Sequence, residues 1–371
     1  MIKNDPLRGV KSKVLQVPAY SLHAYEADIK LNQNENPFDF PTDLKEEVFQ
    51  RFKTREWSRY PDFVPDSVRE RLAEFSGWHR NGVLVGNGSN ELLQATLMVL
   101  VDNGTKVVIP TPTFTVYALI AAILGAEVIR IPLNSDMSYN VDELISESER
   151  SGAGVLIINT PNNPTGSVIQ NKELRRILEE FSGHVLLDEA YFEFWGHSGL
   201  ELLEEHPRLI ITRTFSKAMG MAGLRVGYLL AHEDLVSEIS KAKLPYNVNQ
   251  FSLTAVEVAV ENKERFRSAI ETVLKERDRL AGELNRISGI KVYPSKANFL
   301  LVEVPFEPKE IFEALYRQGI LIRDVSSYPM LSKCLRISVG TREENDRLLS
   351  ALRTVMEHGI SGGSKSARES I

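Results

Sequence analysis

The feature that most constrains the fold is the regular alternation of short apolar runs with longer amphipathic segments between residues 83 and 230. The runs that have the length of a strand are 83–85, 106–109, 127–131, 155–158, 185–187, 209–211 and 227–230. Segments between them, such as 90–101 and 172–181, have the length of helices. Largely apolar strands separated by helices predict an α/β fold with a mostly parallel seven-stranded sheet that is covered on both faces.

The pattern changes after residue 262, which predicts a second unit of α+β type. A long charged helix is expected over 264–286, followed by the strand-like segment "KVYPSKANFLLVEV" and a helix over 308–318. The runs "ILIRDV" and "CLRISV" then precede a last helix. That helix opens with Thr341 and Glu344, which have the spacing of a capping box.

We therefore expect a large domain over residues 31–262 and a small C-terminal domain over 263–358. Residues 1–30 are expected to form an arm that joins the small domain. The stretch "SGGSKSARESI" makes up most of 359–371, which we predict to be a disordered tail.

Composition excludes several classes of protein. The 371 residues are 43% apolar and carry a net charge of −6, so neither a basic nucleic-acid surface nor a disordered chain is indicated. The longest charge-free apolar stretch, 116–126, is shorter than the ~20 residues of a membrane helix. The N-terminus has no apolar segment of a secretory signal. One cysteine and seven scattered histidines predict neither a disulfide nor a metal site, so we expect a cytoplasmic globular protein.

Ligands of parallel sheets bind beyond the carboxyl ends of the strands, so the residues that follow each predicted strand are candidates for a site. The first strand is followed by "GNGSNE", residues 86–91, and then a helix. Its glycines allow close backbone approach, and the helix N-terminus can bind an anion. An ordinary turn capped by Ser89 or Asn90 fits the same residues. A dinucleotide-binding loop does not, because Glu91 stands where a third glycine is required.

A carboxylate and a lysine follow two later strands. Asp188 of "DEAYFEF" can pair with a protonated ring nitrogen, a metal or an arginine, or cap a helix. Lys217 of "TRTFSKAMGMAGLRVGY" lies among small and apolar side chains, which favours a buried amine over one that extends to solvent. Burial and the like charge of Arg225 would make this amine a nucleophile. To be neutral at pH 7 it requires a pKa about 3 units below the reference of about 10.4.

The turn "NTPNNPTGSV", residues 159–168, is more rigid than a simple chain reversal requires. Its two prolines restrict the backbone, so that the amide of Asn163 can be held in one direction. The turn follows a strand of the same sheet, and we expect Asn163 at the same edge as Asp188 and Lys217. A purely structural turn is the alternative, but the convergence of four polar clusters favours a ligand site.

In their residues and their order along the chain, these motifs resemble those of the fold-type-I pyridoxal-phosphate (PLP) aminotransferases, and within them the histidinol-phosphate aminotransferase group. The matching segments, found between about residues 31 and 340, are "LNQNENP", "RYPD", "GNGSNE", "PTPTF", "NTPNNPTG", "DEAYFEF", "TFSKAMGMAGLRVGY", "PYNVN" and "CLRISVG". The resemblance is highly specific for the superfamily and less so for the substrate group.

The resemblance implies roles for the matching residues. Lys217, Asp188 and Tyr191 would be catalytic: the lysine binds the cofactor as an imine and moves a proton, and the aspartate keeps the pyridine nitrogen protonated. Tyr191 and Asn163 would hydrogen-bond the phenolic oxygen. Phe114 would stack on the ring, with Tyr117 as the alternative. The remaining residues expected to bind the cofactor, chiefly its phosphate, are Gly88, Ser89, Asn90, Thr214, Ser216 and Arg225.

The family pattern also implies a homodimer with shared sites, in which Tyr60 of "RYPD" reaches the phosphate in the partner subunit. Without the resemblance, Tyr60 and Phe114 would be read as packing residues. Arg336 of "CLRISV" alternates with apolar residues and so lies on the polar face of a strand, where it is either solvated or, as the family implies, a fork for the α-carboxylate of glutamate.

Histidinol phosphate has no carboxylate, so its phosphate would take the same position. Arg323, Tyr20 and Asn36 are the further candidates for substrate binding. The N-terminal stretch "VPAYSLHAYEAD" departs from the subgroup, which commonly has Pro-Tyr followed closely by Pro-Gly, and Asn90 stands where an acidic residue is common. The alternatives are therefore an aromatic amino-acid aminotransferase or a phospho-amino-acid decarboxylase. A non-catalytic metabolite-binding module and a dehydrogenase fit the motifs less well.

Overall fold

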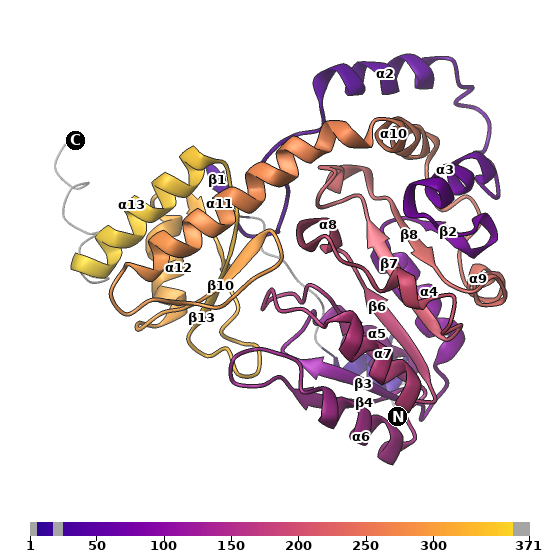
Figure 1. Cartoon of the computed structure of the whole chain (residues 1–371), viewed down its shortest axis with the longest axis horizontal. Helices are drawn as coiled ribbons and strands as arrows, with labels where there is room; N and C mark the ends of the chain where they lie inside the picture. The colour runs from indigo at the N-terminus through magenta and orange to yellow at the C-terminus, as the bar shows by residue number, and fades with distance from the viewer. Residues whose placement is uncertain (1–5, 18–24, 359–371) are drawn as a thin grey trace.

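The chain is described here from a computed structural model, and the description covers residues 6–17 and 25–358. Two groups of elements lie side by side and are linked by the long helix α11, Arg267–Asn285 (Figure 1). Within these ranges, none of the helices combines the length and the hydrophobicity that crossing a bilayer requires.

The larger group contains the predicted seven-stranded sheet, and all seven predicted strands are present. Its strands are β2 (Val83–Gly86), β3 (Lys106–Thr111), β4 (Glu127–Pro132), β5 (Val155–Asn159), β6 (His184–Asp188), β7 (Leu209–Thr214) and β8 (Gly227–Leu230). They lie in the order β2-β8-β7-β6-β5-β3-β4. Only β8 runs antiparallel to its neighbours. The twelve residues between β7 and β8 contain only a short 3₁₀ turn, η3 (Ala222–Leu224), which is too little for the crossover that parallel strands require.

Two apolar clusters cover the two faces of this sheet, as the unbroken apolar runs predicted. In β5, Val155 and Ile157 belong to one cluster, whereas Leu156 and Ile158 belong to the other. One face is covered by α4 (Ser89–Leu100), α5 (Val116–Leu124) and α9 (Glu233–Ser240). The other is covered by α2 (Thr42–Lys53), α3 (Asp66–Ser76), α6 (Val141–Ser151), α7 (Asn171–Glu180) and α10 (Gln250–Glu261).

The C-terminal group has its own apolar core and a four-stranded antiparallel sheet of order β12-β13-β10-β9. Its strands are β9 (Lys291–Val292), β10 (Phe299–Glu303), β12 (Arg323–Asp324) and β13 (Cys334–Ser338), and its other helices are α12 (Pro308–Tyr316) and α13 (Arg342–His358). The helix predicted over 264–286 begins as a 3₁₀ turn, η4 (Lys263–Phe266), before α11. The capping box is confirmed, because the Thr341 N–H donates to the Glu344 carboxylate and the Glu344 N–H donates to the Thr341 hydroxyl.

The N-terminal segment contacts both groups. Strand β1 (Ile29–Lys30) pairs in parallel with β11 (Ile320–Leu321) of the C-terminal group. The helix α1 (Ser12–Gln16) instead lies against α5, where the Lys13 amine donates to the Gly125 carbonyl at 2.6 Å. The predicted domain limits stay a prediction, and the predicted tail, 359–371, lies outside the described residues.

Candidate active site

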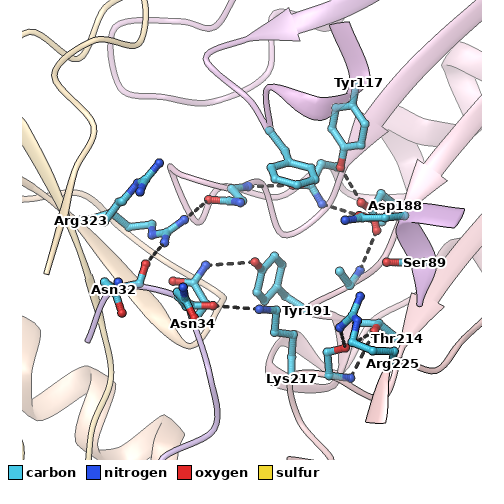
Figure 2. A pocket seen from close by; sticks show the side chains of 18 of the residues that line it. Asn32, Asn34, Ser89, Tyr117, Asp188, Tyr191, Thr214, Lys217, Arg225 and Arg323 are labelled. Carbon is cyan, nitrogen blue, oxygen red and sulfur yellow. Dashed lines mark hydrogen bonds between the residues drawn. The ribbon is translucent and has the colours of Figure 1, made fainter. Parts of the chain in front are cut away.

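A cavity of about 210 Å³ lies at the carboxyl ends of β5, β6 and β7, where the N-terminal segment and β13 close over the sheet. Figure 2 shows side chains from these separate segments pointing into it. The predicted residues that line it are Ser89, Asn90, Phe114, Tyr117, Asn163, Asp188, Tyr191, Thr214, Ser216, Lys217, Arg225, Arg323 and Arg336. The strand-end rule therefore brought most of the candidates to one place.

Asp188 is the carboxylate at the floor of the cavity, with 4% of its surface exposed. Its Oδ2 accepts a hydrogen bond from the Tyr117 hydroxyl at 2.5 Å, and its Oδ1 accepts from the Ala190 N–H and the Thr212 hydroxyl. Burial raises its pKa to about 6, against the opposing effect of these hydrogen bonds. Tyr117 thus acts as a partner of Asp188, and its ring meets that of Phe114 edge-on at 5.5 Å.

Lys217 lies half-buried in the cavity wall. Its amine donates to the Gln33 carbonyl at 2.9 Å and lies 5.9 Å from the centre of the Tyr191 ring. Desolvation lowers its pKa to about 8, and the like charges of Arg336 and, less strongly, Arg225 act in the same direction. The predicted lowering of the Lys217 pKa is present. Arg336 contributes more to it than Arg225, the residue that the sequence had indicated, because the fold brings β13 against this amine.

An anion-binding corner lies at the start of α4. Ser89 and Asn90 begin the helix, and Ser216 accepts hydrogen bonds from the Thr214 hydroxyl at 3.0 Å and the Arg225 guanidinium at 3.1 Å. Gly88 lies directly behind Arg225: its φ is +82°, and a Cβ there would approach Nη2 of Arg225 to 2.6 Å. Free N–H groups at the helix start, hydroxyls and a guanidinium form a site suited to a phosphate.

The opposite side of the cavity is formed by two arginines from the C-terminal group. Arg323 of β12 and Arg336 of β13 are paired residues of the antiparallel sheet. Arg336 is 8% exposed, and its guanidinium donates to Oδ1 of Asn163 at 2.6 Å and to the carbonyl of Asn32. The side chain of Arg323 has no hydrogen bond or ion pair to any other residue in 6–17 or 25–358. It is therefore available to a second anionic group.

Comparison with known proteins decides the family. The model of the family described as aminotransferase class I and II matches residues 26–352. The chain belongs to the class I and II aminotransferases.

Its relatives include two proteins named histidinol-phosphate aminotransferase. The one from Prosthecochloris aestuarii is 39% identical over 341 residues, which cover 91% of this chain and 95% of the relative. The one from Chlorobaculum tepidum is 40% identical over 329 residues, which cover 88% and 94%.

Solved structures show the same fold at lower identity. The crystal structure of the Sinorhizobium meliloti histidinol-phosphate aminotransferase in complex with pyridoxal-5'-phosphate has a TM-score of 0.85 at 23% identity, covering 94% of this chain and 98% of that one. The L-threonine-O-3-phosphate decarboxylase of Porphyromonas gingivalis has a TM-score of 0.78 at 23% identity, covering 89% and 99%. The predicted fold class is confirmed.

Three of the predicted residues, Asn36, Tyr60 and Gly88, do not line the cavity. Asn36 donates to the Ala218 carbonyl at 2.8 Å, so its side chain supports the loop of Lys217. Tyr60 is 80% exposed and stacks on Tyr246, with ring centres 4.6 Å apart. Gly88 lies behind Arg225, as described above, and Tyr20 lies outside the described residues.

Other residues line the cavity without having been predicted: Asn32, Gln33, Asn34, Asn159, Ala190 and Tyr328. The first three belong to "LNQNENP", a motif that the sequence singled out, although a different asparagine was chosen from it. Asn159 ends β5 and holds the Asn163 N–H with its Oδ1 at 2.8 Å. Its position at a strand end was the signal that could have found it.

The reactivity of Lys217 should follow its lowered pKa. In protein prepared without cofactor, we expect trinitrophenylation of Lys217 to rise with a midpoint near pH 8, whereas ordinary lysines have a pKa of about 10.4. Because Arg336 acts as a like charge, Arg336→Met should move the midpoint upward. Labelling rates across pH, resolved by peptide mass spectrometry, measure this. Arg323→Met is the matched control, because Arg323 is not among the groups that shift this pKa. A midpoint near pH 10 in the parent protein would contradict the assignment.

Proposed function

We propose that this chain is a PLP-dependent aminotransferase that moves an amino group between glutamate/2-oxoglutarate and histidinol phosphate/imidazole acetol phosphate, a reaction of histidine biosynthesis. The observation that carries the proposal is a single cavity with a half-buried amine, a buried carboxylate and an anion-binding region at each end. The names of the relatives at 39–40% identity support the substrate.

The residues present fit PLP. Lys217 offers an amine of lowered pKa for a covalent bond to an aldehyde. The carboxylate of Asp188 accepts a hydrogen bond from Tyr117, and it has further lone pairs that can accept one from a ring N–H. The amide nitrogen of Asn163 lines the cavity without a hydrogen-bond partner in the described part of the chain. The corner of Ser89, Ser216 and Arg225 suits the phosphate. When bound, PLP supplies an electron sink for the negative charge that forms at the substrate's Cα.

The protein's own part in the reaction is to hold the substrate and to move protons. We assign the proton transfer to Nζ of Lys217, because a pKa of about 8 lies close to neutral pH, where a general base is most effective. Asp188 stabilises positive charge at the ring nitrogen, and its burial strengthens that interaction. Asn163 and Tyr191, which both line the cavity, would hold the phenolic oxygen.

The second anionic group of the ligand is assigned to Arg323 and Arg336. Glutamate would place its α-carboxylate at Arg336, and histidinol phosphate would place its phosphate between the two guanidinium groups. Their pairing across β12 and β13 keeps both on the same side of the cavity. An aromatic amino-acid aminotransferase would need one of these arginines, and a phospho-amino-acid decarboxylase would need both. The fold that this chain shares with an L-threonine-O-3-phosphate decarboxylase therefore does not distinguish histidinol phosphate from a phospho-amino acid as the substrate.

We further propose that the enzyme is a homodimer in which Tyr60 is donated to the neighbouring site. In its own chain, Tyr60 is exposed and absent from the cavity lining. The large apolar side chains of Trp57, Phe63 and Leu244 are also exposed, which is typical of a surface that a partner covers. A cytoplasmic location stays a prediction.

The covalent bond can be tested directly. The purified protein should be yellow, and borohydride should bleach it and leave a pyridoxyl group on Lys217 alone. Lys217→Ala should abolish this label, because Lys217 is the one lysine among the described residues that line the cavity. Peptide mapping by mass spectrometry locates the adduct. A label on another lysine, or none, would refute the proposed function.

The substrate can be tested by half-reactions with a panel of amino donors. We expect histidinol phosphate to change the cofactor spectrum much faster than phenylalanine. Arg323→Gln should reduce kcat/KM for histidinol phosphate about 10- to 100-fold, because a charge-assisted hydrogen bond to the phosphate is lost. Arg317→Gln, an exposed position beyond α12, is the matched control. Conversion by phenylalanine but not by histidinol phosphate would exclude the proposed substrate.

Shared sites predict complementation between two inactive chains. Lys217→Ala removes the amine from its own site, and Tyr60→Ala removes the hydroxyl from the partner's site. A heterodimer of the two variants regains one native site, so a randomly reassorted mixture should recover about a quarter of the parent activity. Activity and sedimentation of the mixture measure this. Recovery no greater than the mean of the separate variants would show that Tyr60 acts within its own chain.

A further inference from the structure

Asn34 has an unusual backbone conformation at the closure of the cavity. It is 1% exposed, and its φ is +55°, in the left-handed region that residues other than glycine rarely adopt. Asparagine tolerates this conformation better than most residues, but it still costs free energy that the surroundings must offset. The conformation places its side chain between β13 and Tyr191, and a dashed line in Figure 2 joins it to the Tyr191 hydroxyl.

The hydrogen bonds of Asn34 have a defined direction. Its backbone N–H donates to the Ser338 hydroxyl at 2.9 Å, so the hydroxyl proton is free to be donated onward. Ser338 donates that proton to Oδ1 of Asn34 at 3.1 Å, and Nδ2 of Asn34 then donates to the Tyr191 hydroxyl oxygen at 3.0 Å.

The reverse orientation of the amide is disfavoured. Ser338 is buried, and its hydroxyl has no other hydrogen-bond acceptor in residues 6–17 and 25–358. Turning the Asn34 amide would present its NH₂ group to Ser338 and leave the hydroxyl proton unpaired. An unpaired buried donor costs about 1–3 kcal/mol. The amide nitrogen of Asn34 is therefore directed toward Tyr191.

The direction of the Tyr191 O–H follows from this arrangement. Tyr191 receives a hydrogen bond from Asn34, so its own proton is not given to that residue. The described residues offer this proton no acceptor, and Tyr191 lines the cavity. Burial raises the pKa of Tyr191 to about 12, against the opposing effects of Arg336 and Asn34, so the hydroxyl stays protonated at neutral pH. Its proton is left to a group within the cavity.

We propose that Asn34, held by Ser338, is a positioning residue that makes Tyr191 donate a hydrogen bond to the phenolic oxygen of the cofactor instead of accepting one. The inference rests on the proposed function, because it concerns a cofactor at this site. It adds a relay, Ser338 to Asn34 to Tyr191, whose members come from β13, the N-terminal segment and the loop after β6.

The experiment is a pH titration of the visible absorbance of the holoenzyme, which follows the proton on the nitrogen that joins Lys217 to the cofactor. A hydrogen-bond donor at the phenolic oxygen stabilises the negative charge of that oxygen most when the nitrogen has lost its proton. The donor therefore lowers the pH at the midpoint of the titration. Tyr191→Phe and Asn34→Gly should each raise the midpoint, by about one pH unit for Tyr191→Phe. Glycine is chosen because it adopts a φ of +55° without strain.

A double variant separates the relay from a general structural effect. If Asn34 acts through the Tyr191 hydroxyl, Asn34→Gly should not move the midpoint further when Tyr191 is already phenylalanine. The charges of Arg336, Lys217 and Asp188 around Tyr191 are the same in every variant, so their effects cancel. An equal additional shift in the double variant would overturn the relay.

The matched control is Asn298→Ala. Asn298 is fully buried, and its amide donates to the Asn34 carbonyl at 3.0 Å, so it supports the same backbone without contacting Tyr191. We expect this variant to lower the melting temperature and to leave the midpoint of the titration unchanged. A midpoint that follows the melting temperature across all variants would show that Asn34 has only a structural role.

The outcomes distinguish the inference from the proposed function. If Tyr191→Phe shifts the midpoint and Asn34→Gly does not, the relay is wrong and the proposed role of Tyr191 stands. If neither variant shifts the midpoint, the relay and the proposed role of Tyr191 are both wrong. The presence of the cofactor is tested independently by the covalent label on Lys217. Should Asn34→Gly fail to fold, Ser338→Ala frees the amide to turn and should raise the midpoint in the same direction. No shift in that variant would overturn the relay.

Discussion

The guanidinium of Arg336 joins the parts of the chain that form the cavity. From β13 it reaches Oδ1 of Asn163 in the loop after β5 and the carbonyl of Asn32 in the N-terminal segment. A buried cation is costly unless its donors are satisfied, and these two oxygens offset part of that cost. The same charge lowers the pKa of Lys217. One side chain therefore closes the site and also adjusts the amine on which the proposed chemistry depends.

The charge distribution of the cavity explains which ligands it suits. Among the described residues, the cavity is lined by four cationic side chains and one carboxylate, Asp188, although the chain as a whole has a net charge of −6. The cations are Lys217, Arg225, Arg323 and Arg336. Cations concentrated in a partly closed cavity attract anions more strongly than the same charges on an open surface. The cations are also separated: Arg225 lies beside the start of α4, and Arg323 and Arg336 lie on the C-terminal sheet. This arrangement favours a cofactor and a substrate that are both anionic.

Much of the fold and of the site could be predicted from the sequence, because both follow short-range rules. Apolar runs identified the seven strands, and residues at strand ends identified Asp188, Asn163 and Lys217. The rest required long-range information. Asn34 reaches the cavity because β1 pairs with β11 about 290 residues away, and no local pattern indicates that pairing. The preference for Asn36 over Asn34 failed to anticipate a left-handed backbone, which redirects the side chain.

The alternation of β13 connects substrate binding with the relay. Arg336 and Ser338 are two residues apart on this strand, so their side chains lie on the same face. The strand pattern had predicted a polar face, but every residue of β13 is buried, because this face packs against the N-terminal segment and the cavity. Under the proposed function, a ligand anion bound by Arg336 would therefore act on the strand that carries Ser338, the residue that holds Asn34. Recognition of the substrate and the proposed control of the cofactor's oxygen would thus share one strand.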